Sequence, residues 1–215
     1  MNNPPSGVRT VANMALVGGR PAVDFVNTLS DRTVDPPREL LNSFDDLLVW
    51  AVRVELFGKS EARRLAASAR EHPRKAAEAL AHARALREAL FGLFTAQIER
   101  RNPPAHALAV LNGILEEGLQ KRRLESTDHG LCWTWAEKPS RLDWILWPLA
   151  WSAAELLSSS EVARLKECGQ DDCRWIFLDL SKNRSRRWCT MEECGNRAKA
   201  RRHYARGREA RNEKR

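Results

Sequence analysis

The spacing of apolar residues predicts α-helices along most of the chain. The longest stripe lies between residues 73 and 101, where apolar residues recur three or four positions apart, at Leu80, Ala83, Leu86, Leu90, Phe94 and Ile98. This period places them on one face of a helix and leaves the charged residues on the other. The same spacing predicts a helix after the "NPP" at 102–104, and another within 140–157 that we expect to bend at Pro148.

The start of the chain predicts a strand and then a helix. A short apolar run at 14–17 precedes a pair of glycines, which favour a turn. The next segment opens at Pro21, a residue suited to the first position of a helix, and its apolar residues Val23, Val26 and Leu29 fit one helical face.

Capping residues set the expected bounds of the next two helices. Ser43 is a suitable N-cap because Asp46 follows at the third helical position, where its carboxylate can bond back to the cap. We expect this helix to end at Gly58. Ser60 then predicts the start of a further helix that runs to about Pro73.

A β-hairpin is predicted between residues 121 and 137. In "LCWTWAE" the side chains of Leu131, Trp133 and Trp135 alternate with smaller ones, and the turn-like "STDHG" lies just before. We expect these tryptophans, with those of the helix at 140–157, to form a shared core. An aromatic-lined pocket is the alternative.

Positive charge is concentrated near the C-terminal end. The 215 residues include 36 Lys and Arg against 28 Asp and Glu, which gives a net charge of +8. From Arg164 onward the count is 16 against 8, which leaves 20 of each sign in residues 1–163. A local basic excess is typical of a protein that binds a polyanion, most often a nucleic acid, with an anionic membrane surface as the alternative.

Since no segment reads as a signal peptide or membrane span, we expect a cytoplasmic protein.

Four of the five cysteines lie in this basic region. Four residues separate Cys168 from Cys173, four separate Cys189 from Cys194, and fifteen lie between the two pairs. Two close pairs at such a distance are typical of a zinc site, in which each pair supplies two thiolates. An iron–sulfur cluster or four unrelated buried cysteines are the alternatives. Because four protein ligands leave no open position, we predict one structural Zn²⁺ ion rather than a catalytic one.

The residues around these cysteines resemble a known family. The segment "CRWIFLDLSKNRSRRWCTMEECGNRAKARRHYAR" is similar to the CGNR zinc finger, which takes its name from the run that begins at Cys194. The front of the chain, with "GGRPAVDFVNTL" and "DDLLVWA", resembles the ABATE domain, which precedes this finger in bacterial proteins. That family is described as stress-induced transcription regulators. The resemblance therefore implies a regulatory N-terminal domain and a finger that binds DNA.

These features predict a mainly α-helical fold with a small β component (α+β). The length suits one main domain and a small appendage. We expect a helical N-terminal domain with a β-hairpin, followed by a zinc-stabilised, ββα-like module. The expected units are a flexible leader at 1–13, an ABATE-like regulatory domain at 14–157, a hinge at 158–163, a CGNR-type zinc finger at 164–208 and a basic tail at 209–215.

A basic helix from about Glu192 to Arg206 would carry cations on both of its flanks. Arginines of such a helix can read guanine edges in the major groove, while cations of the preceding loop hold phosphates. The predicted nucleic-acid-binding residues are Lys182, Arg184, Arg186, Arg187, Arg197, Lys199, Arg201, Arg202, Arg206 and Arg208. A merely solvated charged surface, or phosphate binding without sequence reading, is the alternative.

Two residues near the cysteines are predicted to support the metal rather than to touch DNA. Asn196 follows the last ligand and can hydrogen-bond a neighbouring thiolate or backbone group. Trp188, with Trp175, is expected to pack beside the zinc as the core of the module, and base stacking is the alternative.

Polar residues in the main domain raise the question of a ligand pocket. Asp24, Asn27 and Thr28 lie on a segment that otherwise reads as buried. They can line a small-molecule pocket, but we favour helix capping and internal hydrogen bonds. No nucleophile stands beside a recognisable base in the sequence, so we predict that the chain is not an enzyme.

The sequence thus favours a bacterial, DNA-binding transcription regulator. In this interpretation the zinc finger presents its basic helix to duplex DNA, while the N-terminal domain senses a signal, such as a small-molecule effector, or mediates interactions. An RNA-binding or ribosome-associated protein that uses the same finger is the first alternative. An enzyme that uses the finger as a docking module is the second.

Overall fold

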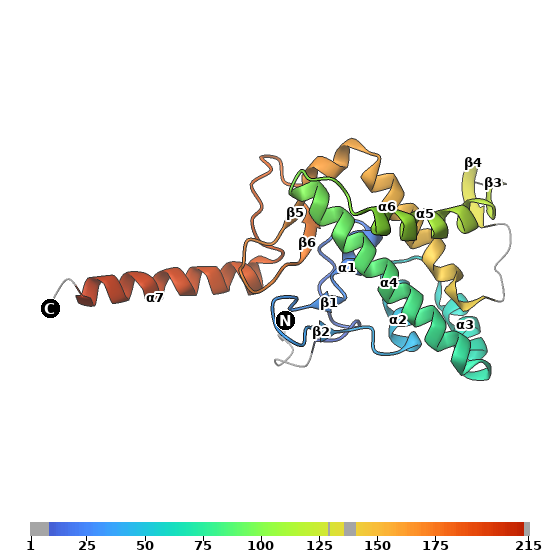
Figure 1. The fold of residues 1–215 in the computed structure, drawn as a ribbon, viewed down its shortest axis with the longest axis horizontal. Helices are drawn as coiled ribbons and strands as arrows, with labels where there is room; N and C mark the ends of the chain where they lie inside the picture. The colour runs from blue at the N-terminus through green and yellow to red at the C-terminus, as the bar shows by residue number, and fades with distance from the viewer. Residues whose placement is uncertain (1–8, 129, 136–140, 213–215) are drawn as a thin grey trace.

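The computed structural model describes residues 9–128, 130–135 and 141–212, with side chains as far as Ala205, and these residues form helices and small antiparallel sheets (Figure 1). The α-helices are α1 (Pro21–Val26), α2 (Phe44–Arg53), α3 (Lys59–Glu71), α4 (Pro73–Ile98), α5 (Ala105–Leu119), α6 (Leu146–Leu157) and α7 (Asn196–Asn212). Shorter helical turns are η1 (Leu142–Ile145), η2 (Ser160–Arg164) and the π-turn η3 (Met191–Gly195). The strands pair as β1 (Leu29–Ser30) with β2 (Arg38–Glu39), β3 (Arg122–Thr127) with β4 (Gly130–Trp135), and β5 (Leu165–Glu167) with β6 (Ile176–Leu178).

Helix α4 is the centre of the fold. Its 26 residues pack against α1, α2, α3, α5 and α6, and Figure 1 shows it crossing the body of the molecule. The stripe found in the sequence forms its buried face, since Ala83, Leu86, Leu90 and Phe94 are fully buried. The predicted fold class, mainly α with small β-hairpins, is confirmed. No helix in the described ranges combines the length and the apolar character that a membrane crossing requires.

Two predicted helix starts are confirmed. Helix α1 opens at Pro21. Helix α2 is capped by Ser43, whose side chain accepts from the Asp46 N–H at 3.1 Å, while the Asp46 carboxylate accepts from the Ser43 N–H at 2.8 Å. This reciprocal pair satisfies two amide groups that the helix itself leaves free. The expected cap at Ser60 is wrong, because α3 begins at Lys59 and Gly58 is its N-cap, so Ser60 lies inside the helix.

Helix α2 ends five residues before the predicted stop at Gly58. Glu55 adopts a left-handed conformation with φ of 58°, and the Leu56 N–H donates to the Ala51 carbonyl at 3.0 Å. This arrangement ends a helix at Arg53 by satisfying its free carbonyls. Because glycine usually occupies the left-handed position, a glutamate there gives no signal in the sequence.

The strand predicted at 14–17 is not formed. The Arg53 guanidinium donates to the backbone carbonyls of Val11 and, at 2.9 Å, Met14. A side chain thus satisfies carbonyl groups that a partner strand would otherwise bond. The helix predicted within 140–157 divides into η1 and α6, and Pro148 lies in the first turn of α6, where its missing N–H costs no helical bond.

The predicted hairpin is confirmed, and its tryptophans meet those of α6. The Trp135 ring lies 5.8 Å from that of Trp147, and the Trp133 ring 6.3 Å from that of Trp151. Trp144 and Trp147 are buried, whereas Trp133 is 55% exposed. The aromatic core expected between hairpin and helix therefore covers the base of the hairpin and leaves its outer part open to solvent.

The β5–β6 hairpin belongs to the same hydrophobic core as the N-terminal helices. Ile176, Phe177 and Leu178 are fully buried, and β6 contacts α1 while β5 contacts α4. The Leu178 N–H donates to the Gly18 carbonyl at 3.1 Å. A Cβ at Gly18 would lie 2.6 Å from the Asp24 nitrogen, so only glycine lets this segment pass so close to α1.

The stretch 158–163, predicted as a hinge, connects α6 to the β5–β6 hairpin through hydrogen-bonded turns. Ser158 donates from its hydroxyl to the Ala154 carbonyl at 2.8 Å and so ends α6. Ser159 accepts from the Glu161 N–H at 3.2 Å and so begins η2. The path from α6 to β5 is therefore short and follows regular helical turns.

Candidate metal centre and basic helix

The turn between β5 and β6 presents the first two cysteines. The Cys168 N–H donates to the Trp175 carbonyl at 2.8 Å, which continues the strand pairing by one more bond. The Cys173 N–H donates to the Gln170 carbonyl at 3.0 Å and closes a tight turn. Arg174 takes a left-handed conformation, φ 58°, which returns the chain to β6. Both thiols thus lie at the end of a hairpin that the core of the protein holds in place.

The second pair of cysteines comes from the segment that ends in η3. The Gly169 N–H donates to the Arg187 carbonyl at 2.8 Å, which ties this segment to the first turn. Thr190 caps η3, since its hydroxyl accepts from the Glu193 N–H at 3.3 Å. The π-turn then places Cys194 opposite Cys189 and leads directly into α7.

The four cysteines form one compact, buried cluster, as the sequence predicted. Their sulfur atoms all lie within 4.8 Å of one another, with Cys173 Sγ 3.6 Å and Cys194 Sγ 3.4 Å from that of Cys189. Zinc–sulfur bonds of about 2.3 Å in a tetrahedron place the sulfurs ~3.8 Å apart, so one zinc ion fits here. Several iron atoms would need more widely spaced sulfurs. The cysteines are at most 6% exposed, so the ion would be closed off from solvent.

Hydrogen bonds within the cluster favour the thiolate form of Cys194. Hydrogen bonds from the other cysteines, first from Cys168 and then from Cys173 and Cys189, hold the pKa of the Cys194 thiol far below its usual range. The Arg197 guanidinium adds to this effect, because it donates to the Cys194 sulfur at 3.2 Å. Arg197, which the sequence assigned to DNA, therefore contacts a metal ligand.

Asn196 and Trp188 support the cluster in different ways. The Asn196 side chain donates to the Glu192 carbonyl at 2.9 Å, the backbone alternative that the sequence allowed. The half-buried Trp188 ring lies beside Gly169, which follows Cys168, and Gly195, which follows Cys194. A Cβ atom added to Gly169 would lie 3.2 Å from the ring, and one added to Gly195 would lie 3.1 Å from it. Trp188 thus packs across both turns that present the thiols.

Asp179 shapes the loop that carries the first basic residues. Its buried carboxylate accepts from the Ser181 N–H and the Arg186 N–H, both at 3.0 Å, and from Lys166 Nζ at 2.6 Å. Burial opposes ionisation, but the bonds from Lys166, Ser181 and Arg186 outweigh it and hold the pKa of Asp179 below its usual range. The loop of residues 181–187 is thereby fixed against the hairpin.

The structure divides the predicted nucleic-acid-binding residues into groups. One group is exposed and has no acidic partner within the described ranges: Lys182, Arg184, Arg187, Lys199 and Arg202. Arg197 and Arg201 instead pair with acids of the turn between Cys168 and Cys173, which we call the first cysteine turn. Each of the two arginines lies 3.1 Å from Asp172, and Arg201 also lies 3.3 Å from Asp171. The side chains of Arg206 and Arg208, and the basic tail in part, lie outside the described residues.

Arg186 has a structural role instead of an exposed one. Its guanidinium lies 4.2 Å from the centre of the Phe177 ring and donates to the carbonyls of Trp188, at 3.1 Å, and Cys189. The side chain is half-buried. We therefore expect it to hold the loop in place rather than to contact a phosphate.

Helix α7 carries its cations on opposite flanks. Residues of an α-helix follow one another at about 100°, so Arg197 and Arg201 share one flank, while Lys199 and Arg202 lie on the other. Ala198 lies between them and faces the module, being only 9% exposed. Figure 1 shows α7 projecting away from the rest of the molecule. Among the described side chains of α7, the cations on the flank with Lys199 therefore have no acidic partner.

Asp24, Asn27 and Thr28 all have partners inside the fold. Asp24 accepts from the Gly18 N–H at 2.8 Å, and burial raises the pKa of its carboxyl to about 6. Thr28 donates to the Phe25 carbonyl at 2.7 Å. The Asn27 side-chain amide donates from Nδ2 to the Ile176 carbonyl at 2.8 Å, and its Oδ1 accepts from the Ile176 N–H at 2.9 Å. These contacts fit the internal hydrogen bonding favoured from the sequence.

Sequence reasoning missed the acids of the first cysteine turn. Asp171 and Asp172 stand between two zinc ligands, and only the fold shows that they face α7, about 30 residues further along the chain. The available signal was a pair of acids within a strongly basic region. The bond from Asn27 to Ile176 spans 149 residues and gave no local signal.

Comparison with known protein families covers most of the chain. The model of the ABATE family, described as "Putative stress-induced transcription regulator", matches residues 19–160. The model of the CGNR zinc finger matches residues 164–207 and so includes all four cysteines. No curated protein matches the chain. Both parts of the resemblance found in the sequence are confirmed.

Proposed function

We propose that this chain, which belongs to the ABATE family and carries a CGNR zinc finger, is a bacterial, cytoplasmic transcription regulator that binds duplex DNA through the finger. The N-terminal domain would sense a signal or mediate interactions. The observation that carries the proposal is the set of exposed cations without acidic partners in the described ranges, on the loop of residues 181–187 and on one flank of α7. Because the Asp179 bonds fix the loop and the zinc cluster holds the start of α7 beside it, these charges keep a defined spacing, which phosphate binding uses.

The proposal assigns a structural rather than a catalytic role to the metal. Four cysteine ligands fill a tetrahedral coordination sphere, so no position is open for a substrate or a water molecule. We accordingly propose that the chain acts as a binding protein and not as an enzyme.

Removing the charge on the open flank of α7 should weaken DNA binding. We expect the double change Lys199→Ala and Arg202→Ala to lower the affinity for duplex DNA at least about tenfold at low salt, because two phosphate contacts and their released counterions are lost. Fluorescence anisotropy with a labelled duplex measures this. Arg74→Ala with Lys75→Ala, at the start of α4, removes the same charge elsewhere on the surface and should change affinity less than about twofold.

Equal loss in both double variants would mean that only net charge matters and would contradict a defined binding flank. The same titration with an RNA hairpin separates DNA from RNA binding. Tighter binding to the hairpin than to the duplex, lost in the Lys199 and Arg202 variant, would overturn the DNA proposal in favour of RNA.

Removing the acids that face α7 should have the opposite effect. Asp171 and Asp172 pair with Arg197 and Arg201, so these arginines must break an ion pair before they reach a phosphate. We expect Asp171→Asn with Asp172→Asn to raise the affinity for duplex DNA about three- to tenfold at low salt. The control Glu71→Gln with Glu116→Gln changes the net charge equally on exposed positions of α3 and α5. If both pairs raise affinity by the same factor, the acids do not compete with DNA for the arginines.

A further inference from the structure

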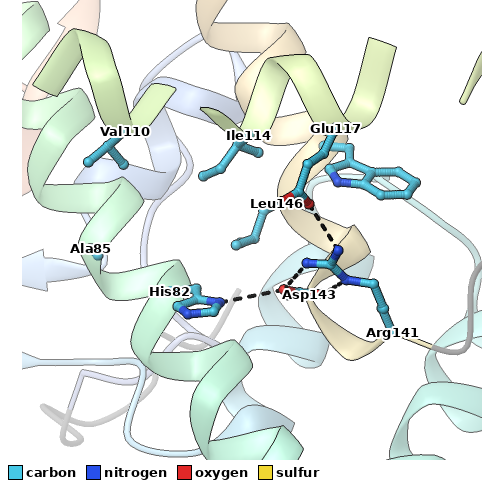
Figure 2. Close-up of a pocket in the computed structure, with 9 residues that line it drawn as sticks. His82, Ala85, Val110, Ile114, Glu117, Arg141, Asp143 and Leu146 are labelled. Carbon is cyan, nitrogen blue, oxygen red and sulfur yellow. Dashed lines mark hydrogen bonds and ion pairs between the residues drawn. The ribbon is translucent and has the colours of Figure 1, made fainter. Parts of the chain in front are cut away.

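A cavity of about 310 Å³ lies in the N-terminal domain between α4, α5 and the start of α6 (Figure 2). Its size is at the lower end of the range of small-molecule sites, which starts at about 300 Å³. Its lining does not include Asp24, Asn27 or Thr28, which the sequence suggested for a ligand. The lining residues are His82 and Ala85 of α4, Val110, Ile114 and Glu117 of α5, and Arg141, Asp143, Leu146 and Trp147 from the segment around η1.

The cavity has an apolar part and a charged part. Figure 2 shows Val110, Ile114 and Leu146 on one side, and a row of charged groups joined by dashed lines on the other. Trp147 adds an aromatic surface to the apolar lining. A site with apolar walls and a few converging polar groups is the usual form of a small-molecule binding site.

The charged part leaves one carboxylate oxygen available. Arg141 donates to both oxygens of Asp143, at 2.9 and 2.8 Å, and lies 3.1 Å from Glu117 Oε2. His82 Nδ1 lies 3.5 Å from Asp143. The Arg141 bonds hold the pKa of Asp143 below its usual range, and both of its oxygens already face Arg141. Glu117 Oε1 has no partner within the described ranges.

Charge decides which ligand fits. Glu117 and Asp143 carry two negative charges, and Arg141 is the one arginine or lysine among the lining residues, so carboxylates outnumber these cations at the rim. An anion that approaches Arg141 would meet the carboxylates of Asp143 and Glu117, which already lie against its Nε, Nη1 and Nη2 groups and repel it. A cation needs no displacement, because it can pair with the open oxygen of Glu117.

We propose that this cavity binds a small amphipathic amine, with its ammonium group at Glu117 and its apolar body against Ile114, Leu146 and Trp147. The inference rests on the proposed function, in which the N-terminal domain senses a signal. It names the cavity as the binding site for that signal and an amine as its chemical class. Helix α6 begins at this cavity and its other end leads through η2 to the hairpin of the first cysteines, so a ligand here lies at one end of the helix that joins the two parts of the protein. Binding is measured by itself below, so failure of the site leaves the DNA proposal untouched.

Three probes of one shape and different charge test the ligand class. We expect 2-phenylethylammonium to bind the zinc-loaded chain saturably in isothermal titration calorimetry, and 2-phenylethanol and 3-phenylpropanoate to bind at least about tenfold more weakly. Glu117→Gln should weaken binding of the ammonium about three- to fivefold, since Glu117 is half exposed and its charge is partly screened. The neighbouring Glu116→Gln, on the exposed side of α5, should leave the affinity unchanged.

A second variant locates the binding without relying on charge. Ala85 is exposed at the cavity wall, so Ala85→Phe should fill the space and abolish ammonium binding while leaving the melting temperature within about 2 °C. Saturable binding to wild type that is lost in this variant supports the site. Absence of saturable binding, undiminished binding in Ala85→Phe, or equal binding of the carboxylate probe would each overturn the proposal.

Discussion

Replacing Cys173 by serine is expected to release the zinc ion and to lower the melting temperature of the whole chain by about 10 °C. A structural zinc contributes roughly 10 to 16 kcal/mol of apparent binding free energy in small fingers, so loss of even a third of it costs about 3 to 5 kcal/mol. For a chain of this length each kcal/mol shifts the melting temperature by about 2 to 4 °C. The loss reaches the N-terminal helices because β6, whose three residues are fully buried, shares their core.

Metal analysis and circular dichroism at 222 nm measure the two parts of this prediction. The matched control is Cys132→Ser, since Cys132 lies on β4 outside the cluster and its change should leave one zinc per chain and the same melting temperature. A Cys173→Ser protein that keeps a full zinc ion would refute the ligand assignment. One that loses zinc but melts like wild type would refute the shared core.

Replacing Asn27 by alanine is expected to be the most damaging change outside the cysteines. The Asn27 side chain supplies both hydrogen bonds of Ile176, the first residue of β6, and both residues are almost fully buried. Alanine would leave a buried N–H and a buried carbonyl without a partner, each at a cost of about 1 to 3 kcal/mol. We expect the free energy of unfolding to fall by about 3 to 5 kcal/mol, with zinc still bound under native conditions.

Guanidinium chloride unfolding of the zinc-loaded protein measures this loss. Asn112→Ala is a suitable control, because Asn112 is exposed on α5 and its loss should change the free energy of unfolding by less than about 0.5 kcal/mol. A similarly small change in Asn27→Ala would show that the bond to Ile176 does not hold the finger to the N-terminal domain.

The parts of the fold that local chemistry determines could be predicted from the sequence. The stripe of α4 and the Ser43 cap depend on residues a few positions apart, and the spacing of the cysteines is a local pattern too. Helix ends were less predictable, because Glu55 takes the left-handed position that usually needs glycine. The end of α2 is set by hydrogen bonds that compete with propensity.

The finger itself could be predicted better than its surroundings. The four ligands and the basic helix follow from spacing and charge, but the pairing of Arg201 with Asp171 and the bond from Asn27 to Ile176 depend on tertiary packing. The sequence indicated a small appendage to the main domain, and only the structure shows that its hairpin shares a core with that domain. Single-sequence patterns carry no signal for contacts of such long range.

The salt dependence of DNA binding tests most directly whether the zinc-held module presents a cationic surface to the duplex. Five exposed cations without acidic partners in the described ranges, if each neutralises one phosphate, predict that log K falls with log salt concentration at a slope between about −3 and −5 from about 50 to 200 mM KCl. The same titration after removal of zinc by a chelator should show weaker binding, because the two segments lose their fixed spacing. A flat salt dependence, or no binding by the zinc-loaded chain at about 50 mM KCl, would contradict this role.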